Sequence, residues 1–136
     1  MKTRLLVLLA FVCLTFSCSR KSDTSAAYAV FADQFAHALA DGRFVEAHAL
    51  LAEEAQNALP AAQLKKQYEE MIAYGPGPGT HVEVMQTLDA WPDKQKGDLG
   101  WVYVAIAGDN FSEAVTVVVT RTGPRLAIRT VEFGRP

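Results

Sequence analysis

The segment Gly75-Pro76-Gly77-Pro78-Gly79 decides the fold, because the hydrophobic pattern changes its period across it. Before this segment, apolar residues recur at intervals of three and four, which is typical of amphipathic helices. After it, they alternate or run continuously among valines, threonines and aromatic residues, which is typical of strands. Since a glycine–proline repeat cannot continue a helix, the sequence predicts a block of helices followed by a block of strands.

The block before the segment is expected to form three N-terminal helices. The first spans residues 26–41 and ends at Gly42, because glycine suits the left-handed conformation that closes a helix. The second is expected over residues 44–57. The third begins at Pro60, since proline is favoured in a first helical turn, and ends before Gly75. The inward-facing residues should include Tyr28, Phe31, Phe35, Ala38, Leu39, Phe44, Ala47, His48, Leu51, Leu64, Tyr68 and Ile72.

The block after the segment is expected to form four strands, at residues 81–91, 99–107, 111–120 and 126–133. The connections between them are short and turn-like, so neighbouring strands should pair antiparallel. Helices segregated from an antiparallel sheet make an α+β domain. The predicted fold is therefore three helices packed on one face of a curved, four-stranded antiparallel sheet, in a single domain from residue 26 to residue 136.

The N-terminus is typical of an export signal. Lys2 and Arg4 precede an uncharged run over residues 5–16, and polarity rises directly after Cys18. A positive start followed by an apolar core of about 7–15 residues describes a secretory signal peptide. The run is shorter than the roughly 20 residues that a membrane span needs. Residues 1–17 are therefore expected to be a signal peptide.

The end of this signal, Leu14-Thr15-Phe16-Ser17-Cys18, resembles the lipobox of bacterial lipoproteins, although Thr15 departs from the family's aliphatic residue. The resemblance implies a lipid anchor on Cys18, a tether over residues 18–25, and a place in the cell envelope. The absence of aspartate at Ser19 resembles outer-membrane sorting, with the domain facing the periplasm. Because Cys13 would leave with the signal, Cys18 would be the one remaining cysteine. The alternative is cleavage near residues 25–27 to a soluble periplasmic protein.

The composition argues against several classes of function. Thirteen basic residues face fifteen acidic ones, so the chain has a formal charge of −2. Nucleic-acid binders carry basic patches, and none is predicted here. The motifs GxxxxGK[ST], HExxH, CxxC and GxSxG do not occur, which argues against nucleotide hydrolysis, zinc proteolysis, disulfide exchange and serine hydrolysis. The three histidines fall on different predicted elements, so no metal site and no cofactor are expected.

The helical block resembles the nuclear transport factor 2-like superfamily, which has a cystatin-like α+β fold. The resemblance lies in Phe31-Ala-Asp-Gln-Phe35, in Ala38-Leu-Ala-Asp-Gly-Arg-Phe-Val-Glu-Ala47 and in Leu50-Leu51, and it extends over about residues 26–133. It implies a cone-shaped cavity between the sheet and the helices. The superfamily contains isomerases, cyclases, dehydratases and non-catalytic binding modules, so it fixes no activity.

Four residues of the domain are candidates for contact with a ligand or partner. His48 and Tyr68 lie on inward helix faces, where a tuned acid or base would act. Their alternative is structural: a core histidine bonded to a carbonyl, and a core aromatic. Trp101 and Tyr103 share one strand face, and Val102, Val104 and Ile106 share the other. We expect the aliphatic set to face the helices, leaving an outer aromatic patch typical of interfaces; the alternative places the aromatic rings in the cavity.

These observations lead to one functional hypothesis and one alternative. The hypothesis is a non-enzymatic envelope lipoprotein whose domain binds a protein or a small ligand, for example an immunity-type protein that neutralises a periplasmic toxin. No catalytic residue is assigned under it. The alternative is a cavity enzyme of isomerase or hydrolase type that uses His48 and Tyr68. Homodimerisation through the sheet face is compatible with both.

Overall fold

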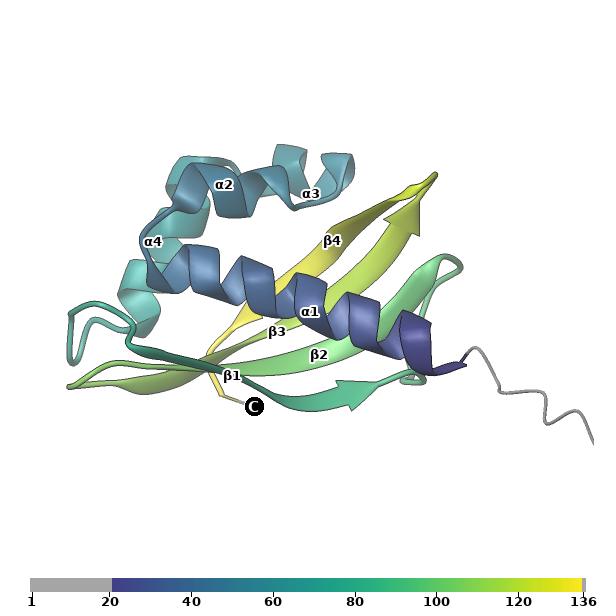
Figure 1. Cartoon of the computed structure of the whole chain (residues 1–136). Helices are drawn as coiled ribbons and strands as arrows, with labels where there is room; N and C mark the ends of the chain where they lie inside the picture. Colours follow the sequence, from purple (N-terminus) through teal and green to yellow (C-terminus); the bar gives the residue numbers. More distant parts are fainter. Residues whose placement is uncertain (1–20, 136) are drawn as a thin grey trace, which may run out of the picture.

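The computed structural model describes residues 21–135, with side chains from Ala27 onward, so Cys18 and the predicted signal lie outside the described residues. The α+β class is confirmed. Figure 1 shows the helices gathered on one side of an open sheet. The elements are α1 (Lys21–Ala40), α2 (Phe44–Ala49), α3 (Glu53–Ala58), α4 (Ala61–Met71), β1 (His81–Leu88), β2 (Asp98–Ala107), β3 (Ser112–Thr122) and β4 (Arg125–Phe133). Among the described helices, none is both long and apolar enough to cross a membrane.

The four strands form an antiparallel meander in the order β1-β2-β3-β4, as predicted. In the middle of the sheet, Val104 of β2 lies between Val84 of β1 and Val115 of β3. Val104 and Val115 are fully buried. The valines on this face therefore form the floor on which the helices pack, and burying them is the main drive for laying the helices on this side.

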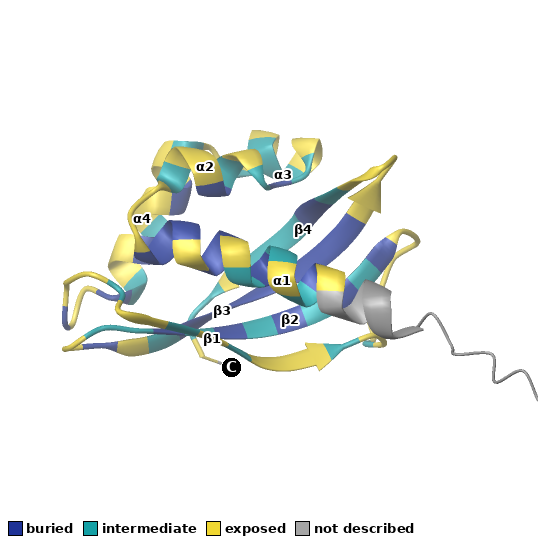
Figure 2. Ribbon diagram, viewed as in Figure 1, coloured by how far each residue is buried: buried dark blue, intermediate teal, exposed yellow. Residues whose placement is uncertain are grey.

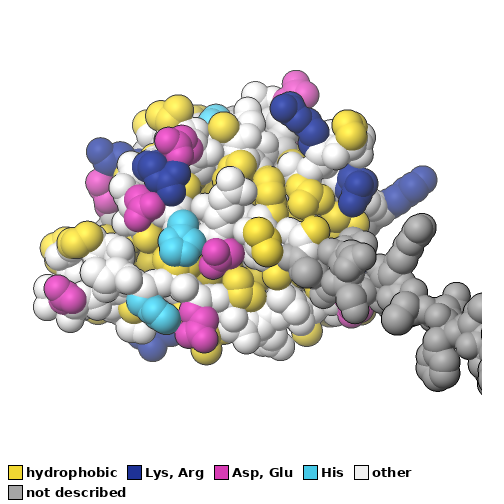
Figure 3. All heavy atoms as spheres, viewed as in Figure 1, with side chains coloured by type: hydrophobic (Ala, Val, Ile, Leu, Met, Phe, Trp, Pro, Cys, Tyr) yellow, Lys and Arg dark blue, Asp and Glu magenta, His cyan; other side chains and the backbone are white. Residues whose placement is uncertain are grey.

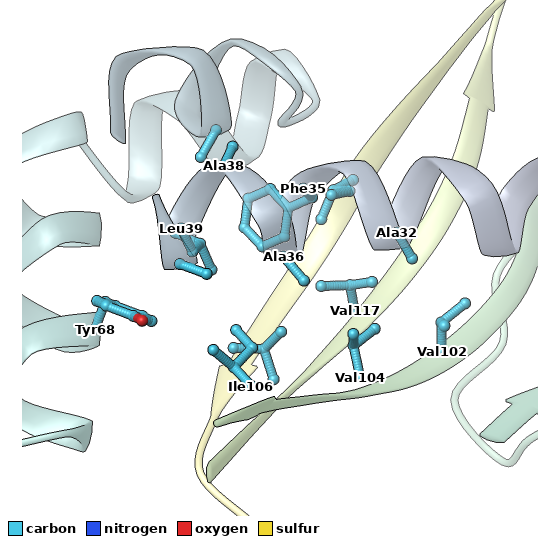
Figure 4. Close-up of a cluster of buried hydrophobic side chains, with 14 of the residues drawn as sticks. Ala32, Phe35, Ala36, Ala38, Leu39, Tyr68, Val102, Val104, Ile106 and Val117 are labelled. Carbon is cyan, nitrogen blue, oxygen red and sulfur yellow. The ribbon is translucent and has the colours of Figure 1, made fainter. Parts of the chain in front are cut away.

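Helix α1 lies across the sheet, mainly over β1 and β2. Its buried face combines Phe35 and Leu39 with the small residues Ala32 and Ala36 (Figures 2 and 4). The alanines let the helix approach the sheet closely. At the N-terminal part of this contact, a Cβ on Gly100 would lie 2.2 Å from the ring of Tyr28, so only glycine fits below that ring.

The sequence predicts where α1 begins and where it ends, and the structure agrees at the second of these points. At the C-terminal end, Gly42 has φ +73°, and the amide of Arg43 donates to the carbonyl of Ala38 at 2.8 Å. This left-handed closure is the predicted one. At the N-terminal end, the helix begins at Lys21 rather than near Ala26, so part of the expected tether is helical.

The predicted helix over residues 44–57 is wrong: the structure has two short helices there, α2 and α3, and four helices in the part of the chain it describes. The break lies at Leu51, which pairs with Ile128 of β4. The amide of Ile128 donates to the carbonyl of Leu50 at 2.9 Å, and the amide of Ala52 donates to the carbonyl of Ile128 at 2.7 Å. These bonds cover part of the outer edge of β4, which would otherwise expose unpaired backbone groups.

Candidate functional site

A pocket of about 580 Å³ opens where the C-terminal ends of α1 and α4 meet the Gly/Pro segment. Its buried floor is formed by Leu39 of α1, Tyr68 of α4 and Ile72, the residue that caps α4. Exposed residues form the rim, among them Asp41 and Glu69. A cavity of this size with apolar walls and few polar groups is typical of small-molecule sites.

The Gly/Pro segment is fixed on both sides, so its prolines stand as a wall of the pocket. A Cβ on Gly75 would lie 2.0 Å from the carbonyl oxygen of Asn110, and a Cβ on Gly79 would lie 2.7 Å from Cβ of Ala40. Glycine is therefore required at both contacts. Pro76 and Pro78 between them line the pocket. The segment that was predicted to separate the helices from the strands is thus also part of the candidate site.

Tyr74, which directly precedes this segment, connects it to β3 by hydrogen bonds. Its hydroxyl accepts a hydrogen bond from the amide of Ser112 at 3.0 Å and lies 3.3 Å from the carbonyl of the same residue, to which it can donate. The ring itself is exposed. Tyr74 therefore contributes to the pocket by holding its wall rather than by lining it.

Tyr68 is the main polar residue of the floor, and it is 4% exposed. Its ring lies against that of Phe44, with centroids 5.7 Å apart at 56°. Figure 4 shows the ring projecting from α4 toward Leu39 of α1, with the hydroxyl foremost. This hydroxyl is buried and has no hydrogen-bond partner among the described residues. An unsatisfied buried hydroxyl is unfavourable, by about 1–3 kcal/mol, and such groups are rare in folded proteins.

The hydroxyl of Tyr68 stays protonated at neutral pH. Burial raises its pKa above the ordinary value of 10.0, and the negative charge of Asp41 raises the pKa further. At neutral pH Tyr68 therefore carries a neutral phenol, which can donate one hydrogen bond and accept others.

The rim carries two charged residues, and both are acidic. Asp41 is 2.9 Å from Nη2 of Arg43, and Glu69 is 3.7 Å from Nζ of Lys65. Neither Arg43 nor Lys65 lines the pocket. Such pairing is common on this surface: on the face shown in Figure 3, acidic and basic side chains lie next to one another.

His48 does not line the pocket that contains Tyr68. Its Nε2 lies 3.2 Å from the carbonyl oxygen of Gln56, and the side-chain amide of Gln56 donates to the carbonyl of Leu51 at 2.9 Å. The two bonds tie α2 to α3 across the break at Leu51. This arrangement is the structural alternative considered for His48, a histidine bonded to a backbone carbonyl.

Trp101 and Tyr103 lie on the face of the sheet away from α1, as expected, while Val102, Val104 and Ile106 are fully buried below the helices. The two aromatic rings stack, with centroids 6.4 Å apart at 12°. Both are partly exposed. They flank Val118 and Thr116 of β3, their opposite residues, which are nearly buried. The rings therefore form a small packed patch on the open face.

Asp98 and Arg129 form an ion pair that spans β3, from the start of β2 to β4. The carboxylate accepts from Nε of Arg129 at 2.8 Å and from Nη2 at 2.7 Å, and from the amide of Gln95 at 2.8 Å. Burial alone would raise the pKa of Asp98, but the bonds from Arg129 and Gln95 outweigh it and hold the pKa below 3.8. This pair serves the fold, because it joins β2 to β4 and its carboxylate takes three hydrogen bonds from within the chain.

Among the other lining residues, Leu39, Phe44 and Ile72 are on the predicted inward faces, but the sequence does not single out the acidic residues Asp41 and Glu69. The signal that could have found them is the position of both residues near the ends of helices that precede glycine-containing turns. Within the described residues, no group of three or more histidine, cysteine, aspartate or glutamate side chains is placed to hold a metal ion.

Comparisons with known proteins found no match: no family model, no curated protein and no solved structure matches the chain. The function is therefore inferred from the residues of the pocket and of the sheet face.

Proposed function

We propose that this protein is a non-enzymatic binding protein whose domain holds a small, mainly apolar molecule in the pocket between α1, α4 and the Gly/Pro segment. The observation that carries the proposal is Tyr68, which lines the pocket and whose hydroxyl, closed to solvent behind this lining, has no partner among the described residues. A ligand that displaces the side chains covering this hydroxyl and bonds to it would remove the penalty of the unsatisfied group.

The construction of the pocket supports this proposal. Its wall is fixed by the hydrogen bond between Tyr74 and Ser112 and by the close contacts at Gly75 and Gly79. A preformed cavity binds more tightly than one that must be ordered on binding, because less conformational entropy is lost. The phenol of Tyr68 then serves as the group that fixes the orientation of the ligand.

The experiment uses two probes that differ only in one hydroxyl: tyrosol, which has a phenolic hydroxyl, and phenethyl alcohol, which lacks it. Each is titrated into the ¹⁵N-labelled protein and followed by amide chemical shifts. We expect both to perturb the amides of Gly42, Tyr68 and Ile72, and tyrosol to bind several-fold more tightly, since a hydrogen bond contributes about 1 kcal/mol.

The Tyr68→Phe variant is the matched control for this experiment. In it, the advantage of tyrosol over phenethyl alcohol should disappear, while phenethyl alcohol binds as before. Perturbation confined to the open sheet face, or no perturbation by either probe, would contradict the proposal.

The open sheet face favours a second candidate function, which is binding of a protein partner. The stacked pair Trp101 and Tyr103 supports it, because partly exposed aromatic rings are enriched at interfaces. An immunity-type role against a periplasmic toxin is one form of this function, and homodimerisation is another. Light scattering tests the dimer. For a different partner, Tyr103→Arg should abolish its capture from envelope extract, whereas Tyr68→Phe should not.

The alternative of an enzyme using His48 with Tyr68 has less support. The ring nitrogen of His48 faces the carbonyl of Gln56, and His48 is not among the residues that line the pocket with Tyr68. The volume between α1 and the sheet is filled by Phe35, Leu39 and neighbouring side chains. A general base needs hydrogen-bond reach of a substrate, which this arrangement does not offer to the pair.

We also propose the setting of the domain: a nuclear transport factor 2-like cone, anchored to the outer membrane by a lipid on Cys18. Helices before an antiparallel meander, all on one side of the sheet, support the fold. The lipobox-like sequence before Cys18 supports the anchor. Unchanged membrane attachment of the Cys18→Ser variant would contradict the anchor.

A further inference from the structure

The charges around the pocket are of one sign. Twelve residues line it, and its two charged side chains, Asp41 and Glu69, are both acidic. Asp41 directly follows the last residue of α1, and Glu69 lies in the last turn of α4. A charged group of a bound molecule would therefore meet carboxylates on two sides of the mouth.

The two helices add to this field. α1 ends at Ala40, which lines the pocket. α4 ends at Met71, and the next residue, Ile72, lines the pocket as well. The C-terminal end of a helix carries a partial negative charge, which favours cations nearby. α1 has 20 residues and α4 has 11, long enough for the dipoles to develop. Only the short α2 begins at the pocket, with Phe44.

The field reaches the floor of the pocket as well as its mouth. The charge of Asp41 contributes to the raised pKa of Tyr68. Arg43 and Lys65 reduce the field, but both are exposed, and both lie outside the lining of the pocket. Because neither base lines the pocket, the two carboxylates remain the charged groups of the lining.

We infer that the pocket selects a small organic amine: a molecule with a cationic nitrogen near Asp41 and Glu69 at the mouth, and an apolar body whose far end is directed toward Tyr68 at the floor. This inference rests on the proposed function and adds the chemical class of the ligand. A carboxylate of the same shape is disfavoured, because it would meet two like charges and two helix C-termini.

The test compares three probes of one shape that differ in charge: tyramine, which is cationic, tyrosol, which is neutral, and para-hydroxyphenylacetate, which is anionic. Affinities are measured by amide chemical shifts of the purified protein at low salt. We expect the order amine, alcohol, carboxylate, with tyramine favoured over the carboxylate by about tenfold. The ratio should fall as salt is added, because salt screens exposed charges.

Two adjacent glutamates of α4 supply matched variants. Glu69 and Glu70 each lie 3.7 Å from the lysine four residues earlier and are similarly exposed, but only Glu69 lines the pocket. Glu69→Gln should lower the ratio of amine to carboxylate affinity by about threefold, and Glu70→Gln should leave it nearly unchanged. Both variants lose one exposed ion pair, so their stabilities should match.

The outcomes separate this inference from the proposed function. If tyrosol binds in the pocket and tyramine has no advantage over the carboxylate, the selection of amines is wrong while ligand binding stands. An equal loss of the ratio in Glu70→Gln would also overturn it, since the effect would then be one of overall charge. If none of the three probes perturbs the pocket, both proposals fall.

Discussion

Two buried polar side chains of this protein differ in how they are satisfied. The carboxylate of Asp98 receives two hydrogen bonds from Arg129 and one from the amide of Gln95, whereas the hydroxyl of Tyr68 has no partner among the described residues. Both groups are removed from solvent. The chain therefore completes one buried polar group by its own contacts and leaves the other without a partner among the described residues. The first arrangement stabilises the fold, and the second lowers stability where a ligand can bind.

The largest expected effect is at the satisfied pair. Arg129→Met would leave the carboxylate of Asp98 buried without its cation, which destabilises a protein by about 3–5 kcal/mol. The measurement is urea-induced unfolding at neutral pH. Arg121→Met is the control, because Arg121 is exposed on the neighbouring strand, and its change should stay within about 0.5 kcal/mol. Equal effects of the two variants would show that the pair does not hold the strands.

Acid should weaken the wild-type protein through the same pair. The folded pKa of Asp98 lies below its unfolded value of 3.8, so the unfolded chain takes up a proton first as the pH falls. The stability that Asp98 contributes is complete above that value and is lost as the pH falls below it. Each unit of pKa difference corresponds to about 1.4 kcal/mol.

The comparison of wild type with Arg129→Met isolates this contribution from the other carboxylates. In the variant, burial would raise the pKa of Asp98 rather than lower it. The difference in unfolding free energy between the two proteins should therefore shrink as the pH is lowered from neutrality toward about 3. A difference that is constant with pH would mean that Asp98 does not titrate with the pair.

The arrangement of helices and strands could be predicted because it depends on local patterns. The change of period at the Gly/Pro segment, the closure at Gly42 and the alternation in β2 are each readable within a few residues. The break at Leu51 could not be predicted in this way. It arises because backbone groups of Leu50 and Ala52 bond to Ile128, more than 70 residues away in the sequence, and this pairing overrides a strong helical pattern.

The candidate site was predictable only in part, for a related reason. Tyr68 was expected inside because of its helical spacing, but a missing hydrogen bond cannot be read from spacing. Arg129 shows the limit on the strand side. Strict alternation along β4 would put the side chain of Arg129 on the same face of the sheet as that of Val131. A bulge instead leaves Arg129 as the extra residue between Ile128 and Thr130. The bulge turns the side chain of Arg129 toward Asp98. The pocket itself needs three separated segments to meet, and no single stretch encodes that.

The smallest effects, but the sharpest contrast, are expected from one substitution made at two tyrosines. Tyr74→Phe removes a hydroxyl that bonds to the backbone of Ser112, so it should destabilise the protein by about 1 kcal/mol. Tyr68→Phe removes a buried hydroxyl that has no partner, so it should stabilise the protein by a similar amount while weakening the binding of tyrosol. Thermal unfolding of both variants, with and without tyrosol, measures whether each substitution raises or lowers the stability.

If Tyr68→Phe were destabilising without ligand, the hydroxyl would have to be satisfied in the free protein, and the contrast with Asp98 would no longer hold. If it is stabilising, the same hydroxyl that lowers the stability of the empty domain is the one that a ligand completes. Such an exchange of stability for binding is expected at functional sites.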